Sequence, residues 1–340
     1  MIIKVKNSEA SVSVDLNGGA ITEFRLKDID VNPISFKFSK DQMPANNKSG
    51  AVYQGHFACI GRWGPPSDGE IKTGQPNHGQ SAVSLWEEAE HTDTTIKMKV
   101  HTSLEALDTF RTLTISSDAA AFEVTEVIKN VSNTGRLYNV VQHPTLAAPF
   151  LNKDTRVDSN ATSGLNYNFD TNPLQYACEW PKGLCEDGRV IDLNVPDIVH
   201  NSVFSFVVDK QAAHGWITAW SPVHSLLIGY VWKRADHPWI DVWQQFGEGE
   251  LKFRGIEFGT SGVHKSFKEI MAHNNTRLLG ENTVSYLDAG EEVSRSYGAF
   301  LLKTGSGFTG VESITVQNGN LSIKPKQGEA IELKTGFKTI

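Results

Sequence analysis

The chain has 340 residues, of which 39% are hydrophobic and 21% are charged, as is typical of soluble globular proteins. Its formal net charge is -7 and it has no long run of lysine or arginine, so no nucleic acid is expected as a partner. No apolar run approaches the roughly 20 residues that span a bilayer. Because of this, we expect no membrane contact. Three cysteines in a chain of this length do not form a disulfide framework, so we expect a cytoplasmic protein.

Period-two alternation of apolar residues predicts half-buried strands at 94–100 (TTIKMKV) and 122–131 (FEVTEVIKNV). The runs lie too close together for the crossover helices of a parallel sheet, and only 264–279 shows helical spacing. The pattern therefore predicts an all-β fold, a large antiparallel sandwich or barrel with few short helices. Further β-rich runs, bounded by Gly, Pro, Asp and Ser, lie at 204–209, 215–220, 225–232, 239–246 and 251–259.

Two irregular segments, 41–77 and 152–197, are rich in Gly, Pro, Asn and Asp. Loops of this length are often functional in a compact fold, so we expect them to wall a binding cleft. The last segment alternates around an Asn-Gly pair at 318–319, which predicts a hairpin at an edge of the main sheet. Because so short a piece seldom folds alone, we expect a β-sandwich domain at 1–302 and a C-terminal β-hairpin extension at 303–340 packed on it.

Arg62 and His78 flank a Gly- and Pro-rich stretch, GRWGPPSDGEIKTGQPNHG. An arginine fork and an imidazole offer directional donors to sugar hydroxyls or to a carboxylate, so both are candidate substrate-binding residues. The structural alternatives are an ion pair of Arg62 with Asp68 or Glu70, and a strand-capping role for His78.

His143 follows the apolar run YNVVQ and precedes Pro144. A residue before proline is biased toward an extended conformation, so the strand is predicted to run into His143 and to stop there. A strand end fixes the direction of the ring, which suits a catalytic acid with a near-neutral pKa. The alternative is a structural histidine that satisfies a backbone carbonyl.

Glu257 lies between Ile256 and Phe258 in a β-like run and is predicted to point away from both, toward the face that Gly255 and Gly259 leave uncrowded. Apolar surroundings would raise the pKa of the carboxyl and make it a general base near neutral pH. The alternative is a carboxylate on a solvated face of the sheet.

The segment 231–247 combines tryptophans with charged and amide groups. Flat indole faces beside polar groups suit sugar rings, so Trp239 and Trp243 are candidate substrate-binding residues, although at least one tryptophan here is expected in the core. Asp241 alternates with its apolar neighbours and is expected to reach the same cleft. Arg234 is a further candidate, because its guanidinium can hold a carboxylate or a phosphate.

Metal and cofactor chemistry lack their usual sequence signals. No histidine has a metal-ligand partner at the short spacing that zinc sites favour. The motifs of acyl transfer, phosphate loops and dinucleotide binding do not occur in the sequence. We therefore expect neither a metal nor an organic cofactor.

The order of these motifs resembles the galactose mutarotase-like superfamily, which includes the aldose 1-epimerases, up to about residue 302. VSVDLNGGAITEFRLKDIDVNPI resembles the family's opening strand and double-glycine turn, and GRWG with NHG resembles its arginine loop and first active-site histidine. QHPTLAAPF and GIEFGTS resemble the strands that carry the second histidine, here His143, and the catalytic glutamate, here Glu257. The resemblance implies a large antiparallel β-sandwich, the mutarotase-like supersandwich, with an open cleft for a sugar.

In that family's mechanism the glutamate takes a proton from the anomeric hydroxyl while a histidine protonates the ring oxygen. The resemblance therefore implies an aldose 1-epimerase-like isomerase in which Glu257 is the base and His143 is the acid. It implies a sugar or sugar-derivative ligand and no cofactor, and we expect a monomer or a homodimer. The residues after His143 and Glu257 differ from the family's usual ones, which leaves the substrate open.

Two other functions are consistent with the same residues. One is a carbohydrate-binding protein without catalysis. The other is an enzyme on a related sandwich, such as a lyase, that acts on a uronic acid or an oligosaccharide and holds its carboxylate with Arg62 and Arg234. Within the epimerase hypothesis, a phosphorylated sugar is a further option because Lys233 and Arg234 can meet a phosphate.

Overall fold

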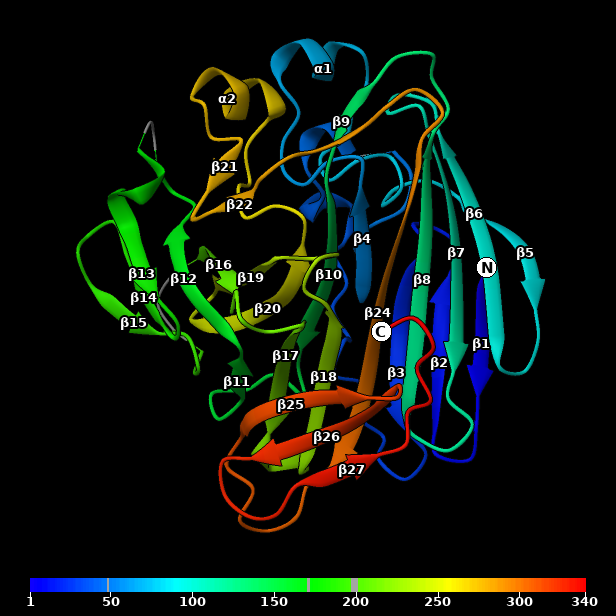
Figure 1. The fold of residues 1–340 in the computed structure, drawn as a ribbon, viewed down its shortest axis with the longest axis vertical. Coiled ribbons are helices and arrows are strands. Elements are labelled where there is room, and N and C mark those ends of the chain that lie inside the picture. The colour runs from blue at the N-terminus through cyan, green and yellow to red at the C-terminus, as the bar shows by residue number, and fades with distance from the viewer. Residues whose placement is uncertain (48, 170–171, 197–200) are drawn as a thin grey trace.

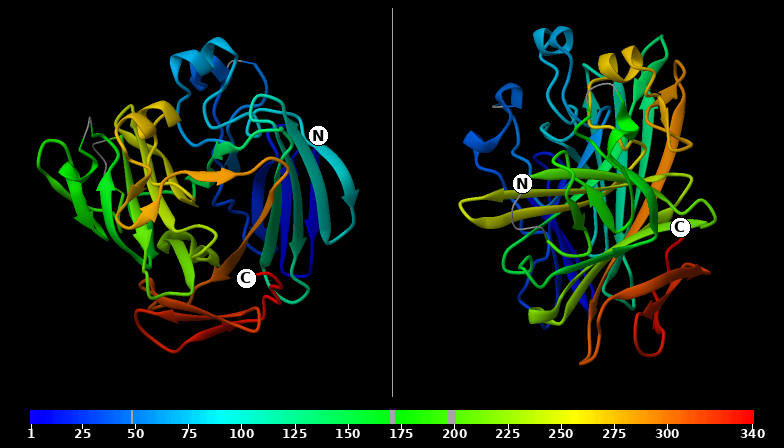
Figure 2. Two further views of the ribbon diagram at one scale, coloured as in Figure 1. Left: turned by 45° about the horizontal axis from the view of Figure 1, so that its top comes forward. Right: turned by 90° about the vertical axis from the view of Figure 1, so that its left-hand side faces the viewer.

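The computed structural model describes residues 1–340 except 48, 170–171 and 197–200. Antiparallel strands dominate the described part, which contains only two α-helices, so the predicted all-β class is confirmed (Figure 1). Two large sheets form a sandwich, with the helices at one end of the molecule and a small C-terminal sheet at the other (Figure 2). Among the described residues, no helix has the length and the apolar character that crossing a membrane requires.

The first sheet has ten strands, and segments far apart in the sequence meet at its centre. β10 (Val140–Ala147) lies near the centre of this sheet. It pairs antiparallel with β4 (His56–Ile60) on one side and with β20 (Glu250–Gly259) on the other. In spatial order the strands are β1 (Ile2–Lys6), β2 (Ala10–Asp15), β3 (Ala20–Leu26), β4 (His56–Ile60), β10 (Val140–Ala147), β20 (Glu250–Gly259), β19 (Trp239–Gly247), β16 (Ser202–Val208), β12 (Ala161–Asn166) and β13 (Ala177–Glu179).

The second sheet has eight strands and packs its apolar face on the first. Its ladders are antiparallel throughout. In spatial order the strands are β11 (Arg156–Ser159), β17 (His214–Ser221), β18 (Leu226–Lys233), β24 (Glu292–Lys303), β8 (Ala121–Asn130), β7 (Leu107–Ile115), β6 (Thr95–Thr102) and β5 (Glu87–His91).

The main hydrophobic core lies between these two sheets. Along β6, Ile96, Met98 and Val100 are buried while the lysines between them are not, and Phe122 and Val124 of β8 join the same core. This confirms the predicted period-two strands. A strand that covers a core on one side places alternate residues in it.

The two α-helices are short, and both begin with a capping box. Ser67 and Ser266 each accept a hydrogen bond from the backbone N–H of a glutamate three residues later, whose side chain bonds back to the serine N–H. The second helix confirms the helical spacing predicted at 264–279, whereas the first was not predicted. The short elements are α1 (Asp68–Lys72), α2 (Phe267–Ala272), η1 (Lys40–Gln42), η2 (Ala45–Asn47), η3 (Pro173–Tyr176), η4 (Pro222–His224), β9 (Arg136–Tyr138), β14 (Lys182–Leu184), β15 (Val190–Asp192), β21 (Arg277–Leu278), β22 (Glu281–Asn282) and β23 (Ser285–Leu287).

The C-terminal segment forms a sheet of its own. Asn318 and Gly319 have φ values of 50° and 73°, and the strands that they join pair antiparallel, as the Asn-Gly signal predicted. A third strand joins them, so the prediction of an edge hairpin in the main sheet was wrong. Its apolar face, with Ile314, packs against Trp216 of β17 in a second core. The strands are β25 (Val311–Gln317), β26 (Asn320–Pro325) and β27 (Ile331–Leu333).

The two segments expected to be irregular contain strands. Segment 41–77 includes β4, in which all five residues are buried, so it shows no alternation from which a strand could be read. Segment 152–197 includes β11 to β15, which are three to six residues long. Its residues 170–171 and 197 lie outside the described part of the chain.

Candidate active site

Neighbouring strands of the ten-stranded sheet place a row of side chains on one face. The register pairs Phe57 of β4 with His143 of β10, Glu257 of β20 with Asp241 of β19, and Asp241 with Ser205 of β16. His143 and Glu257 face each other because the β10–β20 ladder is in register on both sides of them. Directly paired residues of an antiparallel ladder project to the same face, so the sheet brings together groups that are distant in the sequence.

His143 lies in the middle of β10 and not at the end of a strand. The strand continues through Pro144, which pairs with His56 of β4. The ladder to β20 skips positions 143 and 144 and resumes at Thr145, so the missing N–H of the proline is tolerated. The prediction that the strand stops at His143 was therefore wrong, although the extended backbone still fixes the direction of the ring.

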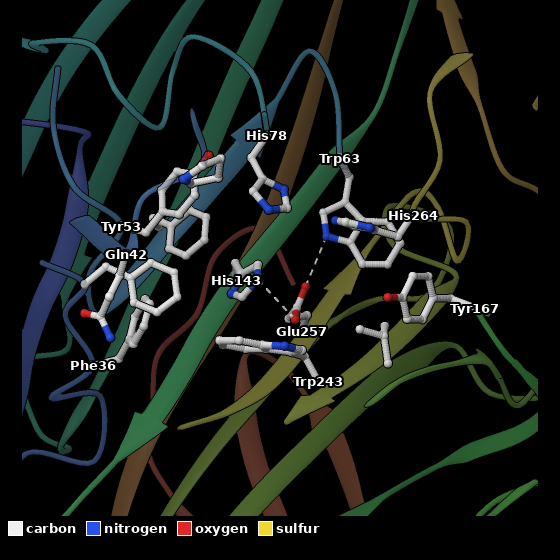
Figure 3. A pocket seen from close by; sticks show the side chains of 14 residues that line it. Phe36, Gln42, Tyr53, Trp63, His78, His143, Tyr167, Trp243, Glu257 and His264 are labelled. Carbon is white, nitrogen blue, oxygen red and sulfur yellow. Dashed lines mark hydrogen bonds and ion pairs between the residues drawn. The ribbon is translucent and has the colours of Figure 1, made fainter. Parts of the chain in front are cut away.

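A cavity of about 270 Å³ lies over the row (Figure 3). This volume is close to the lower end of the roughly 300–1,000 Å³ that is usual for small-molecule sites. Aromatic rings, three imidazoles and one carboxyl dominate its wall. The lining residues are Phe36, Phe38, Gln42, Pro44, Tyr53, Phe57, Trp63, His78, His143, Tyr167, Val203, Trp243, Glu257 and His264.

The centre of the cavity holds a direct contact between an imidazole and a carboxyl. His143 Nε2 lies 3.2 Å from Glu257 Oε1, and both side chains are buried (Figure 3). On the other side of the ring, His143 Nδ1 lies 2.9 Å from the hydroxyl of Thr145, which can in turn donate to the carbonyl of His143 at 3.4 Å. With Nδ1 as the donor to Thr145, a neutral His143 presents Nε2 as an acceptor to Glu257.

Burial shifts the pKa values of this pair in opposite directions. It raises the pKa of the Glu257 carboxyl well above its usual value, and the neighbouring Asp241 raises it further. It lowers the pKa of the His143 imidazole to about 3. Both shifts disfavour charge in a dry site, so burial favours the uncharged pair, with the proton on Glu257 within reach of Nε2.

Two neighbours fix the position of the Glu257 carboxyl. Trp63 Nε1 donates to Oε2 at 3.2 Å (Figure 3). Gly255 supplies the space, because a Cβ at that position would lie 2.6 Å from Oε1. The predicted role of Gly255 in leaving this face uncrowded agrees with the geometry, and Gly259 instead makes room for Val141 of β10.

Two further histidines line the cavity beside the pair. The ring of His78 lies 5.8 Å from that of His143 and 5.3 Å from that of His264. Burial lowers both pKa values, that of His264 to about 4, so both rings are neutral at pH 7. His78 Nδ1 accepts a hydrogen bond from the N–H of Gly64 at 3.3 Å, which leaves Nε2 as a donor. The described residues include no group of three or more His, Cys, Asp or Glu placed to hold a metal ion.

Aromatic rings support the reacting pair. Phe57 stacks on His143 with ring centroids 4.3 Å apart, and Trp243 meets the same ring at 5.7 Å. Trp243 thus lies where the sequence predicted a sugar-binding tryptophan. Trp239 lies elsewhere on β19, fully buried, with its Nε1 donating to the carbonyl of Asn282.

The two predicted arginines lie outside the lining of the cavity. Arg62 is buried and forms a salt bridge with Glu70, one of the structural alternatives, and its guanidinium lies over Phe267. Arg234 forms a salt bridge with Glu281. Each guanidinium therefore already has a carboxylate partner of its own.

Asp241 lies beside Glu257 on the same face of the sheet but does not line the cavity. Its side chain is fully buried and is not part of the lining. Burial raises the pKa of this carboxyl well above its usual value, which the neighbouring Ser205 hydroxyl offsets only in part. The structure therefore does not place Asp241 in the cavity as the sequence predicted; it lies between Glu257 and Ser205 in the row.

The sequence did not single out several residues of the cavity. Trp63 stands next to Arg62 in GRWG, a signal that could have been followed. His264 comes from the loop after β20, Tyr167 from the end of β12, and Phe36 from the segment before β4. Because they lie in irregular segments, no periodicity marks them.

Comparison with known proteins supports the fold. No family model and no curated protein matches the sequence. A galactose mutarotase related enzyme from Lactobacillus acidophilus is similar with a TM-score of 0.64 at 12% identity over 90% of this chain and 99% of its own. A galactose mutarotase-like protein from Clostridium acetobutylicum gives 0.59 at 13% identity, covering 89% and 95%. An aldose epimerase homologue from C. elegans gives 0.59 at 11%, covering 90% and 99%. The chain therefore has the fold of the galactose mutarotase-like proteins, as its sequence motifs implied.

Proposed function

We propose that this protein is an aldose 1-epimerase-like isomerase that interconverts sugar anomers by acid/base ring opening. The observation that carries the proposal is the contact of 3.2 Å between His143 Nε2 and Glu257 Oε1 inside the cavity. The hydroxyl oxygen and the ring oxygen of an aldose are both bonded to C1. Two groups this close together can reach both oxygens at once, as a concerted proton exchange requires.

The reaction needs one proton donor and one proton acceptor, which the pair supplies. The acceptor takes the hydrogen of the C1 hydroxyl, the donor protonates the ring oxygen, and the bond between C1 and that oxygen breaks as C1 becomes an aldehyde. Rotation about the C1–C2 bond presents the other face of the carbonyl, and the reverse transfers close the ring. The pair holds one proton before and after each step.

Burial favours a particular starting state for this cycle. With the proton on Glu257 and a neutral His143, the carboxyl is the acid and the imidazole is the base for ring opening. Transfer of that proton across the 3.2 Å contact gives the converse state, in which His143 is the acid, as the sequence resemblance implies. Trp63 supports that converse state, because its N–H donates to the carboxylate that the transfer creates.

The alternatives receive less support from the geometry. A lyase that acts on a uronic acid would use an arginine to hold the carboxylate, and both candidate arginines, Arg62 and Arg234, form salt bridges outside the cavity. A binding protein without catalysis would have no need to place an imidazole against a carboxyl that lacks a cation partner.

Polarimetry on freshly dissolved aldoses tests the proposal. The wild-type protein is expected to accelerate the approach to anomeric equilibrium for at least one sugar in a broad panel. Glu257→Gln keeps the shape of the side chain but cannot exchange a proton, and it is expected to lose at least about 100-fold in rate.

Glu88→Gln, at an exposed position of β5, is the matched control and is expected to keep the wild-type rate. If sugars raise the melting temperature but no anomer exchange is accelerated, the protein is a binding protein and the enzymatic proposal fails.

A further inference from the structure

The cavity contains no cation to receive an acidic sugar. Among the described residues that line it there is no lysine or arginine, and Glu257 is the one carboxyl. Burial keeps the imidazoles of His78, His143 and His264 neutral at pH 7. An anion transferred from water into such a site without a partner is strongly disfavoured. The cavity therefore suits an uncharged ligand.

One end of the cavity is an aromatic wall. Phe36 meets Phe38 edge to face at 4.8 Å and Trp243 at 6.2 Å, and Phe38 meets Trp243 at 6.5 Å. Phe253 packs behind them, 4.8 Å from Phe36. Figure 3 places Phe36 and Gln42 at this end, apart from the reacting pair. The wall offers apolar surface to whatever part of a ligand reaches it.

The polar groups near this wall are already engaged. The hydroxyl of Tyr53 accepts from Asn47 Nδ2 at 2.5 Å and donates to the carbonyl of Asn77 at 2.7 Å. Gln42 Oε1 accepts from the N–H of Ser39 at 2.8 Å. Of the polar side-chain groups of these two residues, the amide nitrogen of Gln42 at the exposed rim is the one whose N–H groups remain available.

The opposite end presents polar groups beside the indole of Trp63. Figure 3 places His264 and Tyr167 there, with His143 and Glu257 between the two ends. The imidazole of His264 and the phenol of Tyr167 line the cavity, and His78 adds its Nε2 donor above the pair. These groups can satisfy sugar hydroxyls.

Building on the proposed function, we propose that the substrate is an uncharged 6-deoxyaldose, a pyranose with a methyl group in place of the hydroxymethyl group on C5. When C1 and the ring oxygen lie at the reacting pair, C2 and C5 extend toward opposite ends of the cavity. The hydroxyl on C2 needs partners and faces His264 and Tyr167. The substituent on C5 then faces Phe36 and Phe38, where a methyl group is matched and a hydroxyl has only the Gln42 amide at the rim as a partner.

Matched sugar pairs test this assignment on the wild-type protein. L-Fucose with L-galactose, L-rhamnose with L-mannose, and 6-deoxy-D-glucose with D-glucose differ only in the hydroxyl on C6. For at least one pair, kcat/KM for anomer exchange by NMR exchange spectroscopy is expected to favour the deoxy sugar on the order of tenfold. D-Glucose 6-phosphate and D-glucuronate are expected to fall below D-glucose.

Phe38→Gln supplies a partner for the hydroxyl on C6 and is expected to narrow the preference, while Phe110→Gln, at an exposed position of β7, is the matched control. If sugars are turned over but every hydroxymethyl sugar equals or exceeds its deoxy partner, or an anionic sugar is preferred, this inference is overturned and the proposed function stands. If no sugar is turned over, both fall.

Discussion

Replacing Gly255 by alanine probes the position of the Glu257 carboxyl without touching the reacting atoms. The new Cβ would lie 2.6 Å from Glu257 Oε1, whereas ordinary contact begins at 3.4 Å, so the carboxyl must move by about 0.8 Å. That oxygen is the one that faces His143 Nε2 at 3.2 Å. Gly255 has no positive φ, so alanine can adopt the same strand backbone.

A misplacement of about 1 Å in a reacting group can lower the rate on the order of 100-fold, which corresponds to about 2.7 kcal/mol of activation free energy. We expect Gly255→Ala to lose activity of this order in NMR anomer exchange while its melting temperature stays close to wild type. Gly247→Ala is the control on the neighbouring strand, because its Cβ would meet only Lys252 Cγ at 3.9 Å. A folded Gly255→Ala protein with the wild-type rate would refute the reasoning.

Three further predictions concern buried ionisable side chains. Arg111 Nε lies 2.8 Å from Oε1 of the buried Glu126, so Arg111→Met leaves that carboxylate without its charged partner. The variant should lower the free energy of unfolding, measured in urea, by about 3–5 kcal/mol. Adding Glu126→Met should restore most of that loss. Burial holds the pKa of His237 well below 6.5, so at pH 5.5 the unfolded chain binds a proton that the folded chain does not, and this destabilises the wild-type protein. His237→Leu removes that effect, so it should raise the free energy of unfolding by about 1.4 kcal/mol more at pH 5.5 than at pH 8. Arg62→Met breaks the salt bridge to Glu70 and should lower the free energy of unfolding by about 1–3 kcal/mol but leave the KM for sugar unchanged. A loss below about 1 kcal/mol for Arg111→Met, a pH-independent effect of His237→Leu, or a raised KM for Arg62→Met would each contradict the corresponding argument.

Local pattern alone left a structural role open for both Glu257 and His143, and the order of the motifs, through its resemblance to the mutarotase-like family, made them the candidate pair. The β-like run around Glu257 predicted that its side chain points away from Ile256 and Phe258, and the apolar residues before His143 predicted an extended segment. The local sequence pattern could not predict that β10 and β20 are neighbours in the sheet. Only the pairing of strands more than 100 residues apart makes the imidazole and the carboxyl a pair.

The rest of the site depends on contacts that have no local signal. Arg62 and Arg234 carry the chemistry of ligand-binding residues, but tertiary structure pairs them with Glu70 and Glu281. Likewise, Pro144 indicated the end of a strand by its local preference, yet pairing on both sides carries β10 through it.

The measurement that tests the central claim most directly is a double-variant comparison of anomer exchange rates. If His143 and Glu257 act as one acid/base unit, then His143→Asn and Glu257→Gln should each lose at least about 100-fold, and the double variant should be little worse than the poorer single one. Losses that add fully in the double variant, or a wild-type rate in either single variant, would contradict the account.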